Sequence, residues 1–244
     1  MLNEIIYAVI QSATEFFPVS SSGHLALVSN LISQPNLFLF TVLHIASLFA
    51  VLIFTRKEIF ELLKFKKETR KMWIYLIIAT IPAALFGFFF KNYIESAFSS
   101  ILFLGIAFIF TGIVLLFTRT SKSFSELNIK NSLFIGLFQV LALFPGISRS
   151  GMSISAGLFS GIEKEKAVKF SFLLFIPLAL GAFILELGDF YINISIIIAF
   201  FICLFLSLLF LNLLTLIIKK NRFWMFSIYC FIIGIISLAL YFIR

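Results

Sequence analysis

Long apolar runs recur along this chain of 244 residues, and they restrict its fold more than any other feature. Several of them reach the roughly 20 residues that an α-helix needs to cross about 30 Å of hydrocarbon. Apolar residues make up 61% of the sequence and charged residues only 12%, which is about half the charged fraction of an ordinary soluble domain. The sequence therefore predicts an all-α polytopic membrane protein.

Six of these runs have the length and composition of ordinary transmembrane helices. Their expected ranges are 36–55, 72–90, 96–118, 170–187, 190–218 and 223–243. Two further apolar stretches, 2–32 and 132–161, are interrupted in the middle by Pro, Gly and Ser, residues that end one helix and cap the next. We expect these two stretches to form re-entrant helical hairpins, which brings the expected total to about ten helices.

Basic residues gather in four segments outside the apolar runs. These segments are 56–71, 119–131, 164–169 and 219–222. Placing all four on the cytoplasmic side agrees with the six spans, and it makes the first hairpin enter from outside and the second from inside. The formal net charge of +8 is then explained by loops beside anionic lipid, and no nucleic-acid partner is expected. Segment 56–71 mixes basic and apolar residues and is read equally as an interfacial amphipathic helix or as a solvated basic loop.

The two interruptions resemble each other. Phe17-Pro18-Val19-Ser20-Ser21-Ser22-Gly23 aligns with Phe144-Pro145-Gly146-Ile147-Ser148-Arg149-Ser150-Gly151 if one residue is inserted, and three spans follow each. Because an odd number of spans separates the two copies, the second copy has the opposite orientation in the membrane. We therefore predict an inverted-topology repeat, made of residues 1–118 and 132–244 in one membrane domain, whose broken helices meet near the midplane.

Few ionisable side chains fall inside the apolar segments, where each costs about 2.5–3.5 kcal/mol at the centre of a span. The candidates for function are Glu15, His24, Arg149 and His44. Arg149 lies among Ser148, Ser150 and Gly151 at the start of a helix, so free backbone N–H groups and a planar guanidinium predict an anion site there. The other interruption offers the same kind of helix start, at Ser20, Ser21, Ser22 and Gly23.

Gln11 and Glu15 are four residues apart and share one face of the first helix, where their oxygens suit Mg²⁺ or Ca²⁺ with a phosphate completing the coordination. His24 follows the break and is predicted to act as a general acid, general base or nucleophile. His44 is assigned to hydrogen bonding between helices, and so are Gln139 and Asn212. Cys203 and Cys230 lie in apolar runs and are expected to be packing residues rather than a disulfide or metal pair.

The segment from Gln11 to Leu25 resembles the first signature of the bacterial undecaprenyl-diphosphatase family, also called the bacitracin-resistance protein family. Phe144 to Gly151 resembles the second signature, and the pattern continues from Lys169 to Pro177, so the resemblance covers essentially the whole chain. It implies hydrolysis of undecaprenyl diphosphate to the monophosphate and phosphate, recycling the lipid carrier of cell-wall synthesis. It further implies a divalent cation, the bacterial inner membrane and a site that opens to the outer face.

Carried over by position, the resemblance implies that Gln11 and Glu15 form the metal-binding pair, that Ser21 and His24 are the family's hydroxyl and histidine, and that Arg149 is its phosphate-binding arginine. Two positions depart from the commoner pattern: Gln11 stands where many members have Glu, and Ser22 where Thr is common.

Three nucleophiles stay open: Ser21 activated by His24, His24 itself, and a metal-bound water. A lipid-carrier flippase or anion transporter with the same broken helices is the alternative function. A polyprenyl diphosphate lipid and the bilayer are the expected partners, and a homodimer is kept as a candidate assembly.

Overall fold

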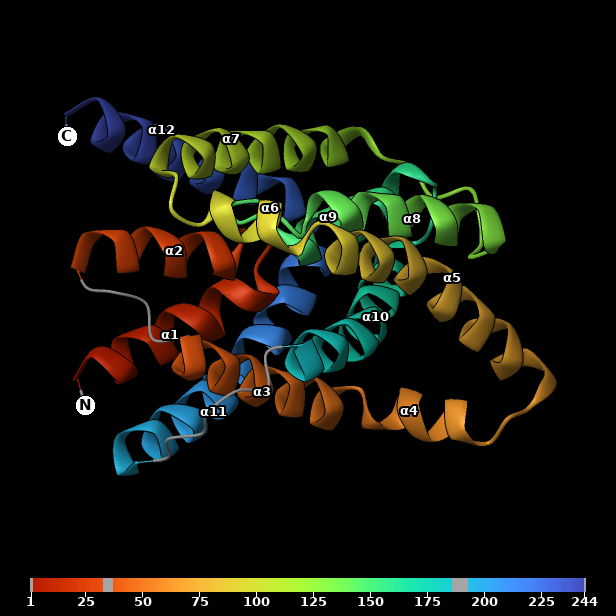
Figure 1. Cartoon of the computed structure of the whole chain (residues 1–244). Helices are drawn as coiled ribbons and strands as arrows, with labels where there is room; N and C mark the ends of the chain where they lie inside the picture. The colour runs from red at the N-terminus through yellow and green to blue at the C-terminus, as the bar shows by residue number, and fades with distance from the viewer. Residues whose placement is uncertain (1, 33–36, 186–192, 244) are drawn as a thin grey trace.

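The computed structural model of the chain describes residues 2–32, 37–185 and 193–243, which form twelve α-helices, two short 3-10 helices and no β-sheet (Figure 1). The helices are α1 (Leu2–Phe16), α2 (Ser21–Ile32), α3 (Leu37–Phe54), α4 (Arg56–Leu63), α5 (Lys67–Phe89), α6 (Lys91–Ala97), α7 (Ile101–Phe117), η1 (Thr118–Thr120), α8 (Ile129–Leu141), α9 (Arg149–Phe159), α10 (Lys164–Leu185), α11 (Ile194–Lys219), η2 (Phe223–Met225) and α12 (Phe226–Ile243).

Within the described ranges, five helices are long and apolar enough to cross a membrane: α5, α7, α10, α11 and α12. Helices α3 and α4 make a sixth span if this pair, bent by 70°, is counted as one. The six expected spans therefore correspond to α3, α5, α7, α10, α11 and α12, and the polytopic helical class is confirmed. The expected ends at residue 36 and at residues 187 and 190 lie outside the described residues.

The expected total of about ten helices was too low, because the chain stays helical around two bends. Thr55 N–H donates to the carbonyl of Val51 (2.8 Å) and Ile59 N–H donates to that of Thr55 (2.9 Å), so α4 continues from α3 around the bend. Helix α6 continues from α5 in the same way, through hydrogen bonds on either side of Phe90. Of the two interpretations of segment 56–71, the helical one agrees with α4, which exposes the apolar side chains of Phe60 and Leu63.

Two pairs of short helices meet in the middle of the bundle, as the interruptions predicted. Helices α1 and α2 join at residues 17–20, and both lie on the side of this join where α1 begins and α12 ends (Figure 1). Helices α8 and α9 join at residues 142–148 and lie on the opposite side. The two joins, which we call the first and second break, therefore face one another.

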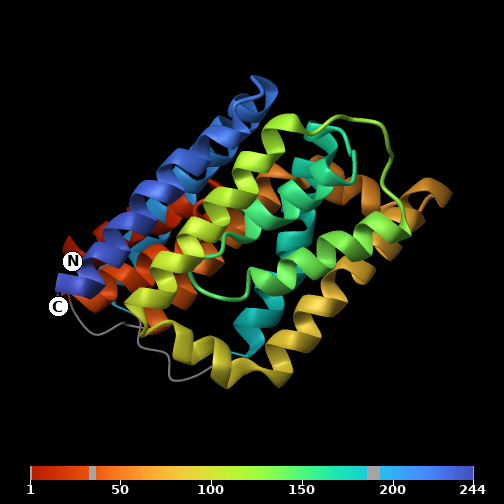
Figure 2. The ribbon, with the colours of Figure 1, turned by 90° about the horizontal axis from the view of Figure 1, so that it is seen from above.

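Small residues bring neighbouring helices close enough to hold the breaks in place. A Cβ at Gly136 of α8 would lie 2.8 Å from the carbonyl oxygen of Ala79 in α5, so these two helices pack backbone to backbone. Helices α7 and α12 cross at Gly105 and Gly234, and they lie side by side in both views (Figures 1 and 2). Such close packing is typical of helix contacts inside a membrane.

Cys203 and Cys230 are both buried and unbridged. Each thiol donates a weak hydrogen bond to a backbone carbonyl, that of Leu43 for Cys203 (3.5 Å) and that of Pro18 for Cys230 (3.7 Å). Both cysteines are thus packing residues, which confirms their prediction.

Candidate active site

The two breaks touch through their backbones. The hydroxyl oxygen of Ser20 accepts hydrogen bonds from Gly23 N–H (3.3 Å) in its own break and from Gly146 N–H (3.1 Å) in the other. Ser20 and Gly146 both have left-handed backbone conformations, with φ of 69° and 90°. A Cβ at Gly23 would lie only 2.6 Å from the Cα of Gly146, so this contact requires glycine.

Serine hydroxyls cap both helices that start at this contact. Ser148 accepts from Gly151 N–H (3.0 Å) at the start of α9, just as Ser20 accepts from Gly23 N–H at the start of α2. Thr111 of α7 braces the second break, because its hydroxyl donates to the carbonyl of Gly146 (2.9 Å) and accepts from Ser148 N–H (3.3 Å). Two helix N-termini therefore begin next to each other, an arrangement that favours an anion.

A buried ion pair joins the two breaks. Arg149 Nη2 donates to Oε1 of Glu15 at 2.9 Å, and the two side chains are 17% and 6% exposed. The other carboxylate oxygen, Oε2, accepts from the hydroxyl of Ser21 (2.6 Å) and from Nε2 of Gln11 (3.0 Å). Because residues from both halves of the chain contribute, the cluster forms only when the two breaks come together.

The guanidinium of Arg149 is held in one orientation by α10. Its Cζ lies 4.0 Å above the ring centre of Phe175, and its Nη1 donates a long hydrogen bond of 3.5 Å to the carbonyl of Ser171. An arginine has five N–H donors, and these contacts leave several of them for a bound oxyanion.

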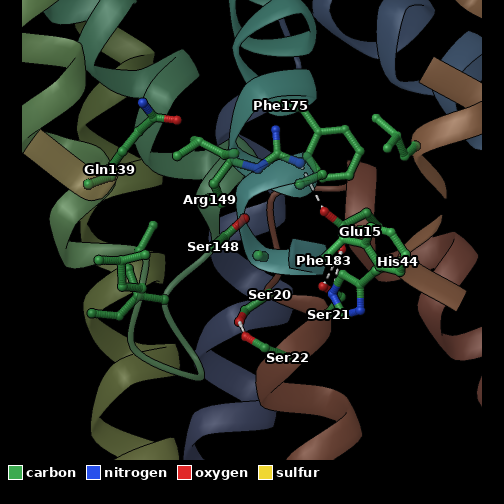
Figure 3. A pocket seen from close by; sticks show the side chains of 18 of the residues that line it. Glu15, Ser20, Ser21, Ser22, His44, Gln139, Ser148, Arg149, Phe175 and Phe183 are labelled. Atoms are coloured by element: carbon green, nitrogen blue, oxygen red, sulfur yellow. Dashed lines mark hydrogen bonds and ion pairs between the residues drawn. The ribbon is translucent and has the colours of Figure 1, made fainter. Parts of the chain in front are cut away.

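A cavity of about 250 Å³ opens from this cluster (Figure 3). Its polar wall consists of Glu15, Ser20, Ser21, Ser22, Thr41, His44, Gln139, Ser148 and Arg149. Its remaining wall is apolar and comes mainly from α10 and the second break, including Leu143, Phe175, Ala179 and Phe183, with Ala83 from α5. The cavity thus has one charged, hydroxyl-rich side and one side suited to hydrocarbon.

Six of the eleven predicted catalytic, substrate-binding and metal-binding residues line this cavity, and four lie behind its wall. Gly23 and Gly151 support the helix caps, and the Ser150 hydroxyl donates to the carbonyl of Phe17 (3.3 Å). Gln11 is fully buried and reaches the cavity only through Glu15.

His24, the fifth predicted residue outside the cavity wall, faces a different part of the molecule. Its Nδ1 is 2.7 Å from the carbonyl oxygen of Ser20, so this nitrogen carries the proton, and Nε2 accepts from the hydroxyl of Tyr229 (2.8 Å). The ring packs between Tyr229 and Phe108 and is not among the described residues that line the cavity. A direct role in proton transfer or attack therefore remains a prediction, and it requires His24 to leave both partners.

His44 and Gln139 line the cavity, although they were assigned only to hydrogen bonding between helices. His44 Nδ1 is 2.8 Å from the carbonyl oxygen of Phe40 on its own helix, and its Nε2 lies 3.7 Å from Oε2 of Glu15 (Figure 3). Gln139 does bond between helices, through Nε2 and the carbonyl of Ala79 (3.0 Å), but its buried Oε1 has no partner among the described residues. No local pattern distinguishes these two from packing residues, because the helices that bring them here are distant in sequence.

A family model described as bacitracin resistance protein BacA matches residues 4–236. The chain belongs to this family. A relative from Thermosipho africanus named undecaprenyl-diphosphatase is 42% identical over 244 residues, which cover 97% of this chain and 98% of the relative. Relatives with the same name are 39% identical in Thermotoga maritima, covering 96% and 98% of the two chains, and 39% identical in Methanococcus maripaludis, covering 95% and 96%. The family indicated by the two motifs is thereby confirmed.

The donor atoms around Glu15 suit a hard cation that the substrate helps to bind. The described residues contain no group of three or more His, Cys, Asp and Glu side chains arranged to hold a metal ion. One carboxylate, the Ser21 hydroxyl and the buried Oε1 of Gln11, which has no hydrogen-bond partner in the described part of the chain, are nevertheless oxygen donors within one cluster. Mg²⁺ is commonly bound by one or two carboxylates with phosphate oxygens and water as its other ligands.

Proposed function

We propose that this chain is an integral-membrane phosphatase that hydrolyses undecaprenyl diphosphate to undecaprenyl phosphate and inorganic phosphate. The observation that carries the proposal is the buried Glu15–Arg149 pair, which joins two capped helix N-termini at a cavity that is polar on one side and apolar on the other. Relatives named undecaprenyl-diphosphatase align with nearly the whole chain. The reaction would return the lipid carrier to peptidoglycan synthesis, and bacitracin resistance is the property in the family's description.

Arg149 and the helix caps would bind the diphosphate. The free N–H donors of the guanidinium suit two non-bridging oxygens at once, and Phe175 keeps the guanidinium plane fixed beneath them. Backbone N–H groups and serine hydroxyls at Ser20, Ser22 and Ser148 would take further oxygens. Phosphoryl transfer depends mainly on such positioning and on electrostatic stabilisation of the charge on the phosphoryl oxygens.

Ser21 is the nucleophile that the geometry supports best. Its hydroxyl lines the cavity and already donates to Glu15, so the carboxylate is placed to accept the proton when the serine oxygen attacks the terminal phosphorus. The bond between that phosphorus and the bridging oxygen breaks, undecaprenyl phosphate leaves, and water then releases phosphate from the serine. A water molecule beside Ser21 would use the same carboxylate as its base.

We further propose that Mg²⁺ or Ca²⁺ is required, held by Glu15, Ser21 and Gln11 together with phosphate oxygens. When bound, the cation would neutralise charge on the diphosphate and so favour its transfer. For Gln11 to contribute oxygen, its amide must turn so that Oε1 rather than Nε2 faces Glu15. The fully buried position of this amide, with Oε1 unpartnered, supports that orientation in the presence of a cation.

The proposal includes an inverted repeat of residues 1–118 and 132–244 within one membrane domain, with α1–α2 and α8–α9 as re-entrant hairpins. Helix packing supports it, because α1 packs along α11 much as α8 packs along α5, and these pairs exchange under the proposed symmetry. The capped breaks support it too, because Ser20 and Ser148 occupy matching positions.

We propose that the site opens to the outer face of the bacterial inner membrane. The cavity is lined by the first half of α3, at Thr41 and His44, and by the second half of α10, at Ala179 and Phe183. These halves lie away from the basic ends of the same helices, which the positive-inside rule assigns to the cytoplasm. The polyprenyl tail would extend between α5 and α10 into the bilayer.

We also propose a homodimer, which light scattering of the purified protein tests directly.

Phosphate release from undecaprenyl diphosphate by purified protein in detergent micelles tests this function against the transporter alternative. Transport needs two compartments, whereas hydrolysis does not. We expect release of phosphate that stops when a chelator is added and is restored by Mg²⁺ or Ca²⁺. Lipid movement in sealed vesicles without phosphate release in micelles would instead identify a flippase.

A further inference from the structure

A second cavity, of about 640 Å³, lies at the end of the helices that carries the basic segments. Residues of α3, α4, α10 and α11 line it, at the bend where α4 turns away from α3. Its polar lining is Thr55, Arg56, Lys57, Glu58, Glu165, Lys169, Asn212, Thr215 and Lys219. Phe172 separates it from the active-site cluster, because its ring packs edge-on against Phe54 on one side and Phe16, next to Glu15, on the other.

Positive charge exceeds negative charge around this cavity. Lys169 pairs with Glu58 at 3.1 Å, and Lys219 lies 3.7 Å from Glu165, so both carboxylates already have a cation beside them. Arg56 and Lys57 have no carboxylate within ion-pair distance among the described residues, although Arg56 Nη1 donates to the carbonyl of Ile53 (3.0 Å). Two cations on the cavity rim are thus available to an anion.

The walls combine apolar side chains with two polar ones on α11, a largely apolar helix. Asn212 and Thr215 lie on α11, a helix of 26 residues, and both line this cavity. The Asn212 amide donates through Nδ2 to the carbonyl of Leu208 (2.8 Å), and its oxygen can accept from water or a polar ligand. Apolar lining comes from Ile53, Phe54, Val168, Phe172, Leu208 and Ile218.

We propose that this cavity binds a membrane lipid whose phosphate headgroup carries a net negative charge. The phosphate would lie against Arg56 and Lys57, and the first part of the chain would lie along the apolar wall. Each lysine or arginine near an anionic lipid contributes about 1 kcal/mol. The site does not depend on the proposed phosphatase activity, because it shares no lining residue with the first cavity.

Native mass spectrometry of the full chain in detergent tests this inference through the retention of added lipid. The probes are phosphatidylglycerol, farnesyl phosphate, phosphatidylcholine and inorganic phosphate. We expect one anionic lipid per chain to be retained in preference to phosphatidylcholine. The variant R56Q/K57Q should weaken retention at least tenfold, and Asn212→Leu should weaken it severalfold.

The matched control is R70Q/K71Q, which removes one arginine and one lysine at exposed positions of α5 that do not line the cavity. It should change retention less than threefold. Tighter retention of farnesyl phosphate would identify a prenyl phosphate as the ligand, and tighter retention of phosphatidylglycerol would identify a bulk phospholipid. Equal weakening by the two double variants, equal retention of phosphatidylcholine, or displacement of the lipid by millimolar inorganic phosphate would overturn the proposal.

Discussion

Replacing Arg149 by lysine separates the charge of this side chain from its shape. Lysine keeps a cation beside Glu15, so the buried carboxylate stays paired and the protein should stay folded. What is lost is the planar guanidinium group above Phe175, which positions two N–H donors on one phosphoryl group. Losing one well-placed donor to a transition-state oxyanion typically costs about 100-fold to 1,000-fold in turnover, which is about 2.7–4 kcal/mol.

Arg149→Ala should show a second effect, on stability. Removing one partner of a buried ion pair costs about 3–5 kcal/mol because the remaining charge is left uncompensated. Glu15 keeps its bonds from Ser21 and Gln11, so we expect a loss near the lower end of that range. The double variant E15Q/R149A, which has no buried charge at this point, should recover thermal stability without recovering activity.

The assays are phosphate release from undecaprenyl diphosphate and the midpoint of thermal unfolding, measured in the same detergent. Turnover by Arg149→Lys within a few-fold of wild type would refute the reasoning, because it would show that the fork geometry contributes nothing. A double variant less stable than Arg149→Ala would show that Glu15 carries no uncompensated charge in the single variant.

Glu15→Gln should abolish chelator-sensitive phosphate release in a protein that stays folded but has a lower unfolding midpoint, because Arg149 loses its buried partner; full activity would show that other residues bind the cation. Gln11→Glu should keep turnover at saturating Mg²⁺ but lower the unfolding midpoint in chelator, since two adjacent buried carboxylates need a cation between them; an unchanged midpoint would contradict this. A cysteine at Glu95, in a chain without its native cysteines, should react with an impermeant maleimide in intact cells, and one at Lys66 only after permeabilisation. Labelling of Lys66 in intact cells and of Glu95 only after permeabilisation would show that the chain has the opposite orientation in the membrane.

The positions of the two breaks could be predicted because a short local run of Pro, Gly and Ser ends one helix and starts the next at each of them. Their matched motifs and the odd number of spans between them also indicated that the broken helices meet, and this meeting brings Glu15 and Arg149 to 2.9 Å from each other. Helix caps are set by hydrogen bonds within four residues, so Ser20 and Ser148 were predictable too.

What could not be predicted depends on contacts between distant helices. His24 lies in the motif, yet its orientation is set by Tyr229, which is 205 residues away. His44 reaches the cavity only because α3 packs beside α1 with that face inward. Neither the rotation of a helix about its axis nor its choice of neighbour is encoded in a single apolar segment, because such segments are apolar on all sides.

The most direct test of the central claim uses undecaprenyl diphosphate labelled with ³²P in the terminal phosphate, in detergent micelles with Mg²⁺. We expect wild-type protein to release the label as inorganic phosphate, and E15Q/R149A, although folded, to leave it on the lipid. Label that stays on the lipid with wild-type protein, or that is released equally by the double variant, would contradict a hydrolytic site built from Glu15 and Arg149.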